Sequence, residues 1–139
     1  MSQDQRKQKR ICVVGSANVD LTFRTPRLPV PGETLAGQSL HQCMGGKGAN
    51  QAVVAARLGA DVTFIARVGN DGFGTQAMEA YTAEGIDTSF VQRDDEEPTG
   101  TAAILVDDDA ENCIIVIAGA NDRLAPDDVR AASAVIEQS

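Results

Sequence analysis

The chain has 139 residues, the length of about one ordinary domain, and its hydrophobic fraction of 42% is enough to form a core. Its formal net charge is −8, which argues against nucleic acid or an anionic membrane as a partner, because both require clustered Lys and Arg. No stretch approaches the about 20 apolar residues that span a membrane.

The N-terminal end combines a basic segment with a short apolar run. We expect residues 1–10, MSQDQRKQKR, to form a solvated, disordered leader. The next run, ICVVG, predicts a buried parallel strand and is too short for the apolar part of a secretory signal. Cys12, Cys43 and Cys113 lack metal-type spacing and lie in or beside apolar segments, so we expect reduced thiols in a cytoplasmic protein.

The following segments are more polar and indicate a second kind of strand. In NVDLTFRT, residues 18–25, apolar side chains alternate with polar ones, which predicts a half-exposed strand near 19–24. The stretch PRLPVPGET predicts a turn, and a weak, mostly polar strand is expected over 34–43.

Two helices are predicted on either side of a second buried strand. GANQAVVAARLGA favours a helix that ends with Gly59 at its C′ position. DVTFIARVG predicts the strand. DGFGTQAMEAYTAEGI predicts the other helix, with Asp71 as its cap and Gly85 at its end.

The last part of the chain predicts a hairpin and a third helix. Two apolar runs within 99–118 flank the acidic turn DDDAEN, and LAPDDVRAASAVIEQS begins a helix with Pro126 in its first turn. Strands that alternate with helices indicate an α/β domain over 11–139. The exposed strands near 19–24, 34–43 and in the 99–118 hairpin predict a small second sheet that stands off the main one.

Residues 44–51, MGGKGANQ, place glycines directly before the first helix. A Walker A loop is excluded, because Lys47 is followed by Gly48 and not by the Ser or Thr that binds magnesium. A dinucleotide fingerprint is excluded, because GSANVD has only one glycine. The turn instead brings together the amides at the helix N-terminus, Lys47 and Asn50. These hydrogen-bonding groups suit a polyol better than a lone anion. The alternative is a tight turn with Lys47 in solvent.

Asn18 and Asp20 follow the first strand directly. In an α/β sheet the ligand crevice lies beyond the carboxyl ends of the strands. An ionised Asp20 accepts hydrogen bonds from neighbouring hydroxyls, and Asn18 can both donate and accept. An Asx-turn that fixes the strand exit is the alternative for this pair. Together with the glycine turn, the pair predicts a cleft that binds hydroxyl groups.

The motifs VVGSANVD, PGET, GGKGANQAVVAARLGA, VGNDGFG, GIDT, PTGTAAILV and AGAN occur in this order from Ile11 to the end of the chain. Together they closely resemble the N-terminal part of the ribokinase-like carbohydrate kinases, and the ribose-specific members more than the fructose or nucleoside kinases. The resemblance implies part of a three-layer α/β/α fold with a small β-sheet lid, and it implies that the lid strands pair two subunits in a homodimer.

The resemblance implies an ATP-dependent transfer of the γ-phosphoryl group to the 5-hydroxyl of D-ribose. The resemblance implies that the sugar is bound at the positions that match the family's motifs, namely Asn18, Asp20, Gly46, Lys47, Asn50, Ala102 and Ile104. Among these, Ala102 and Ile104 match apolar contacts on the hairpin. Asp71, Gly72 and Gly74 match a family turn that we interpret as structural.

The resemblance also implies parts that these 139 residues do not contain. They are a second glycine signature of the DTxGAGD type, which carries the catalytic base, the ATP site, an acidic magnesium motif and a monovalent-cation site. We therefore expect ATP and Mg²⁺ as cofactors of the intact enzyme, together with a monovalent cation. We expect no catalytic or metal-binding residue among these 139, and a polypeptide that is inactive alone.

Two other functions fit the same residues. One is a different sugar or nucleoside kinase of the same family. The other belongs to a different class, a non-catalytic sugar-binding or interaction fragment that pairs through its lid strands.

Overall fold

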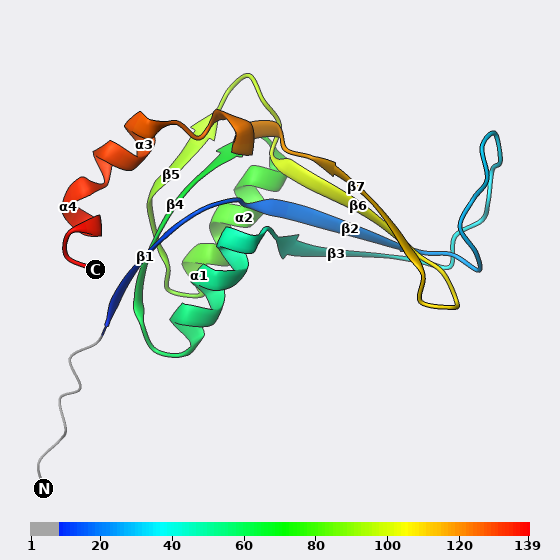
Figure 1. The fold of residues 1–139 in the computed structure, drawn as a ribbon, viewed down its shortest axis with the longest axis horizontal. Helices are drawn as coiled ribbons and strands as arrows, with labels where there is room; N and C mark the ends of the chain where they lie inside the picture. Colours follow the sequence, from blue (N-terminus) through cyan, green and yellow to red (C-terminus); the bar gives the residue numbers. More distant parts are fainter. Residues whose placement is uncertain (1–8) are drawn as a thin grey trace, which may run out of the picture.

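The computed structural model describes residues 9–139, so residues 1–8 of the expected leader lie outside the described part of the chain (Figure 1). The helices and strands follow in the order β1 (Arg10–Val14), β2 (Asn18–Arg24), β3 (Ser39–Gly45), α1 (Lys47–Arg57), β4 (Asp61–Gly69), α2 (Gly72–Ala83), β5 (Asp87–Asp94), β6 (Gly100–Val106), β7 (Asn112–Ile117), the 3-10 helix η1 (Gly119–Arg123), α3 (Pro126–Ala131) and α4 (Ser133–Ile136).

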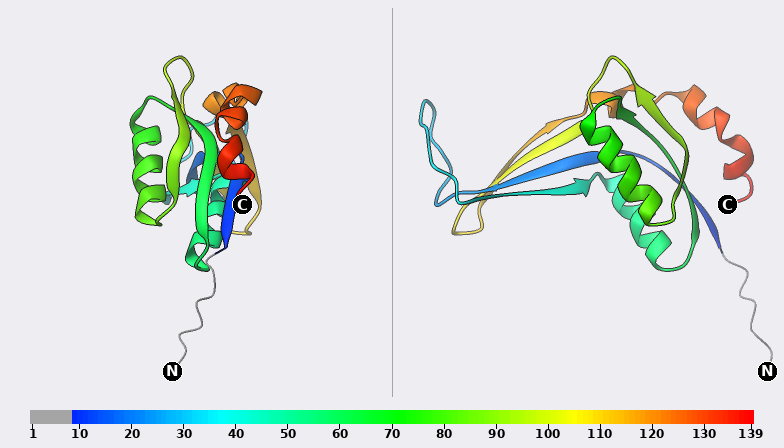
Figure 2. Two further views of the ribbon diagram at one scale, coloured as in Figure 1. Left: turned by 90° about the vertical axis from the view of Figure 1, so that its left-hand side faces the viewer. Right: turned by 180° about the vertical axis from the view of Figure 1, so that it is seen from behind.

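The main sheet is parallel and has the order β1-β4-β5. Helices α1 and α2 cover one of its faces, and α3 and α4 lie on the other (Figure 2). β4 is the central strand, and its side chains Val62, Phe64 and Val68 are fully buried. The predicted α/β class is confirmed. β5 was not predicted from the sequence.

β1 is an edge strand of this sheet. Among residues 9–139 it pairs only with β4, and Ile11 and Val14 are 37% and 47% exposed. The prediction of a buried strand was therefore wrong in its burial and right in its parallel pairing. The apolar sequence indicates a strand that is covered on both faces, but it does not say which strands lie beside it.

The second sheet has the order β3-β2-β6-β7 and extends away from the helices (Figure 1). β2 and β6 are parallel, whereas the two outer pairs are antiparallel, as predicted for the hairpin of β6 and β7. β3 starts at Ser39 and not near residue 34, because Ser39 is paired with Arg24, the last residue of β2. The segment before Ser39 has no partner strand to continue along.

The helix ends agree with the predicted caps. Gly59 adopts φ 90° directly after the C-cap of α1, a conformation that glycine reaches at little cost. The Asp71 carboxylate caps α2 by accepting from the Gly74 amide at 2.8 Å, and it also accepts from the Thr99 amide at 2.9 Å. The predicted last helix is divided into α3 and α4, because Ala132 leaves the helical conformation with φ −98° and ψ 9°.

The core lies between the main sheet and the helices α1 and α2. The rings of Phe64 and Tyr81 make an edge-to-face contact with their centroids 5.4 Å apart. Within residues 9–139, no helix combines the length and the apolar character needed to cross a bilayer. Cys12, Cys43 and Cys113 are free thiols.

Candidate functional site

The site begins where the connection from β1 to β2 touches the start of α1. A Cβ atom on Gly48 would lie 2.7 Å from the Cα of Gly15 and 2.8 Å from the amide nitrogen of Ser16. Because both neighbours are backbone atoms, only glycine allows the helix to approach this closely. The Ala49 amide then donates to the carbonyl of Ser16 at 3.0 Å and fixes the contact.

The glycine turn joins β3 to α1 through Gly46, the N-cap residue. Gly46 has φ 93°, and a Cβ atom on it would lie 2.6 Å from the carbonyl oxygen of Ser16. The turn therefore needs glycine both for its conformation and for the space. It places Lys47 at the first position of α1, where helix amides and the helix dipole favour oxygen-rich partners.

Asn18, Asp20, Ala102 and Ile104 lie on one face of the second sheet. The parallel register pairs Asp20 with Ala102, and the polar and apolar members therefore stand side by side. The Asp20 carboxylate lies over Gly45, because a Cβ atom on that glycine would be 2.1 Å from Asp20 Oδ2. The structure thus brings Asn18 and Asp20 together with the glycine turn and places Ala102 beside Asp20. Ile104 is paired with Thr22 and lies further along the sheet, away from the turn.

Partial burial distinguishes the Asp20 carboxyl from an ordinary surface carboxyl. Burial raises the pKa of Asp20 above its usual value. Burial, and secondarily the Asp20 charge, raises the pKa of Tyr81 to about 12. The Tyr81 hydroxyl is buried without a hydrogen-bond partner among the described residues. Both groups mark a region of low polarity beside β2.

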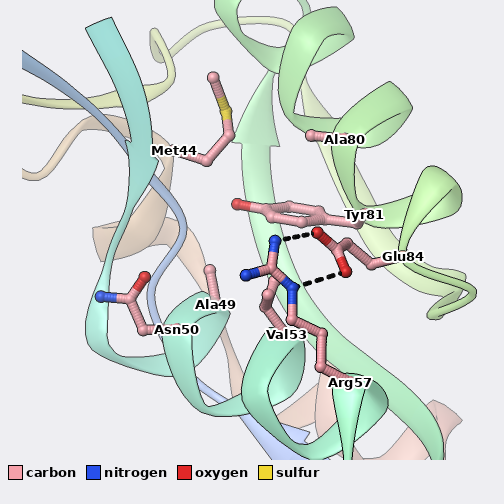
Figure 3. Close-up of a pocket in the computed structure, with 8 residues that line it drawn as sticks. All are labelled: Met44, Ala49, Asn50, Val53, Arg57, Ala80, Tyr81 and Glu84. Atoms are coloured by element: carbon pink, nitrogen blue, oxygen red, sulfur yellow. Dashed lines mark hydrogen bonds and ion pairs between the residues drawn. The ribbon is translucent and has the colours of Figure 1, made fainter.

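Lys47 and Asn50 have exposed side chains at the start of α1. Asn50 lines a cavity of about 320 Å³ between α1 and α2 (Figure 3). The ion pair of Arg57 and Glu84 borders the same cavity, and the Asn50 amide points away from that pair. Asn50 therefore lies at the edge of the candidate site, next to the gap between the helices.

Two residues near Asn18 were missed by the sequence reasoning. Asn121 in η1 donates to Asn18 Oδ1 at 2.8 Å, and Gly100 at the start of β6 leaves room for this bond. Asn121 belongs to the AGAN motif, which is part of the family resemblance, but the sequence alone predicts no role for it. Local sequence carries no signal for a contact between residues 103 positions apart.

Residues 9–139 bring no three His, Cys, Asp or Glu side chains together in a group that could hold a metal ion. The glycine turn also lacks the hydroxyl that a P-loop offers to magnesium. What the arrangement can do chemically is to bind and orient hydroxyl groups.

The family model of pfkB family carbohydrate kinases matches residues 8–139. The ribokinase of Haemophilus influenzae is 46% identical over 132 residues, which are 95% of this chain and 43% of that protein. The deoxyribokinase of Salmonella typhi is 40% identical over 119 residues, which are 86% of this chain and 39% of that protein. The chain thus spans less than half the length of these relatives.

Solved structures show the same fold. The structure of Arabidopsis thaliana ribokinase complexed with ribose and ATP superimposes with a TM-score of 0.82 at 33% identity. The superposition covers 95% of this chain and 43% of that one.

Proposed function

Because the chain belongs to the pfkB family of carbohydrate kinases, we propose that it forms the sugar-binding part of an ATP-dependent kinase that converts D-ribose to D-ribose 5-phosphate. One observation carries the proposal. Asn18 and Asp20 stand on one face of the second sheet, beside the glycine turn and the start of α1. The relatives named ribokinase, and the one solved with ribose and ATP, support the choice of sugar and phosphoryl donor.

The proposed roles follow from the chemistry of each side chain. Asp20 accepts hydrogen bonds from sugar hydroxyls, and Asn18 binds a neighbouring hydroxyl through its amide. Gly46 lets the backbone approach the sugar, and Lys47 and Asn50 add polar contacts from α1. Ala102 and Ile104 contact the apolar face of the sugar ring.

Phosphoryl transfer relies on positioning the acceptor and on stabilising charge on the transferred group. The described residues supply the first of these. We propose that the catalytic base, ATP, Mg²⁺ and a monovalent cation are held by residues outside these 139, and that the enzyme works in the cytoplasm. Residues 11–139 then form one incomplete α/β domain, whose lid is the sheet β3-β2-β6-β7.

Titration calorimetry of the 139-residue chain with D-ribose, without nucleotide, tests the binding role. We expect saturable binding at one site and, in a coupled assay with ATP, no release of ADP above background. Absence of ribose binding would overturn the binding role. Turnover at the rate of an intact kinase would overturn the assignment of catalysis to residues outside the chain.

The similarity to a deoxyribokinase makes 2-deoxyribose the main alternative to ribose as the sugar. Titrations with 2-deoxyribose, fructose and adenosine separate the alternatives. We expect ribose to bind most tightly, because a site built to bond a hydroxyl rejects an analogue that lacks it. Tighter binding of 2-deoxyribose would assign the chain to the deoxyribose-specific members.

We also propose that two copies pair through the lid sheet. β7 is exposed on both of its faces, with Ile114, Ile115, Val116 and Ile117 between 54% and 62% exposed. Monomeric proteins rarely leave such a contiguous apolar surface in water. β7 is the edge strand of this sheet, and an exposed edge strand pairs readily with another chain. We therefore expect a second copy of the chain to cover it.

Sedimentation velocity at micromolar concentration tests this pairing. We expect a dimer for the unchanged chain and a monomer for the double variant Ile114→Lys with Ile115→Lys, which places one charge on each face of β7. The matched control is Val30→Lys, at a loop position that is 60% exposed, and it should leave the dimer intact. A monomer in the unchanged chain contradicts the proposal.

A further inference from the structure

We propose that Asn121 is a positioning residue for the sugar site, and that it holds Asn18 with its amide nitrogen, not its oxygen, toward the sugar. This inference rests on the proposed function. Asn121 does not belong to the predicted sugar-binding residues, and it would act only through Asn18. A set of hydrogen bonds, whose directions are fixed by backbone donors and acceptors, holds the two side chains in this orientation.

Backbone groups on both sides fix the orientation of the Asn121 carboxamide. The Ala17 amide donates to Asn121 Oδ1 at 2.9 Å. The Asn121 Nδ2 donates to the carbonyl oxygens of Ala17 at 3.2 Å and of Ala118 at 3.0 Å. A backbone N–H can only donate and a backbone carbonyl can only accept, so reversing the Asn121 amide would break all three bonds.

Asn121 in turn fixes the orientation of Asn18. Its Oδ1 lies 2.8 Å from the Asn121 Nδ2, which is a donor. Asn18 must therefore turn its oxygen toward Asn121. Its own Nδ2 is left on the other side of the carboxamide, and no residue among 9–139 accepts a hydrogen bond from it. Asn18 thus offers only N–H donors to a ligand.

Packing around η1 and Gly100 holds the two asparagines in place. η1 is anchored by Ala120, which is fully buried and whose amide donates to the carbonyl of Pro98 at 2.7 Å. The bond between the two asparagines passes over Gly100. A Cβ atom there would lie 2.1 Å from Asn121 Nδ2 and 2.5 Å from Asn18 Oδ1. Because glycine has no side chain, Gly100 leaves room for the side chains of Asn18 and Asn121.

The consequence is a defined polarity along β2. Asp20 follows Asn18 on the same face and accepts hydrogen bonds when it is ionised. With Asn18 held as a donor, neighbouring hydroxyls of a sugar meet one donor and one acceptor. A reversed Asn18 would place a second acceptor beside the carboxylate, and it would leave its own oxygen without the N–H it needs from Asn121.

The variant Asn121→Asp tests the inference. It keeps the size of the side chain and the bond from the Ala17 amide, but it removes the donor to Asn18 and to the carbonyls of Ala17 and Ala118. We expect the dissociation constant for D-ribose, measured by calorimetry on the 139-residue chain, to rise about 10- to 100-fold. The control Asn112→Asp makes the same change at an exposed position at the start of β7 and should leave the constant unchanged.

A double-mutant cycle separates positioning from a structural role. In an Asn18→Ala background, Asn121→Asp should cause no further rise in the dissociation constant, because its effect passes through Asn18. An equal rise in both backgrounds would show that Asn121 only supports the backbone at Ala17, and it would overturn the proposal.

Nuclear Overhauser effects decide the orientation without any ligand. In the unchanged chain the side-chain amide protons of Asn121, and not those of Asn18, should lie close to the Hα protons of Gly100. In Asn121→Asp the amide protons of Asn18 should replace them. Contacts from Asn18 to Gly100 in the unchanged chain would overturn the inference. Failure of ribose to bind while these contacts are observed would reject the proposed function and leave the orientation of Asn18 standing.

Discussion

Asp20→Asn is expected to weaken D-ribose binding by about 10²- to 10⁴-fold, the range in which a site loses affinity when a buried polar pairing is broken. The substitution keeps the shape of the side chain over Gly45 but replaces a carboxylate oxygen by an N–H donor. Both side chains at this end of β2 would then offer donors to the sugar. Titration calorimetry on the purified chain measures the change.

The control for this prediction is Asp109→Asn, which removes the same charge at an exposed position in the turn between β6 and β7. It should leave ribose affinity unchanged. In an intact kinase, Asp20→Asn should spare nucleotide binding, because the carboxylate contacts the sugar and not the nucleotide in the proposed site. Equal loss of sugar and nucleotide binding would make Asp20 a structural residue.

The pH dependence of binding gives an independent check. Burial raises the pKa of the Asp20 carboxyl, so it takes up a proton at a higher pH than an exposed aspartate. Only the ionised form accepts from two hydroxyls. Ribose affinity should therefore fall as the pH is lowered through this raised pKa, and the fall should be absent in Asp20→Asn. A pH-independent affinity of the unchanged chain would show that the carboxylate does not bind the sugar.

Local features of the chain could be predicted because their causes are local. Gly59 ends α1 because glycine alone reaches φ 90° at little cost, and Asp71 caps α2 because its carboxylate reaches the Gly74 amide. The hairpin of β6 and β7 follows from two apolar runs around an acidic turn. The second sheet follows from the mixed polarity of its strands.

Features that depend on distant partners could not be predicted. β5, Asp87–Asp94, carries polar residues along most of its length, so its sequence has no run of apolar side chains to indicate a strand. The burial of β1 depends on which strands lie beside it. The role of Asn121 depends on a contact with Asn18, and no pattern within either segment encodes that contact. Asn18 and Asp20, by contrast, stand where the end of a strand predicts a site.

Gly48→Ala is expected to lower the free energy of unfolding by about 3 kcal/mol and the melting temperature by roughly 10 °C. The new Cβ atom would lie 2.7 Å from two backbone atoms of Gly15 and 2.8 Å from the amide nitrogen of Ser16. Backbone cannot rotate away as a side chain can, so α1 must move off the connection between β1 and β2. The bond from the Ala49 amide to the carbonyl of Ser16 would be stretched or lost.

The same movement should also weaken ribose binding, because Lys47 and Asn50 shift with the helix while Asn18 and Asp20 stay on β2. The matched control is Gly72→Ala in the first turn of α2, where nothing lies within 4 Å of the new Cβ atom. Alanine is the better helix former by up to about 1 kcal/mol, so this control should melt at the same temperature or higher. Thermal unfolding followed by circular dichroism, with ribose titrations of both variants, makes the comparison. If Gly48→Ala melts like Gly72→Ala and binds ribose normally, the close approach of α1 to Gly15 is not what shapes the site.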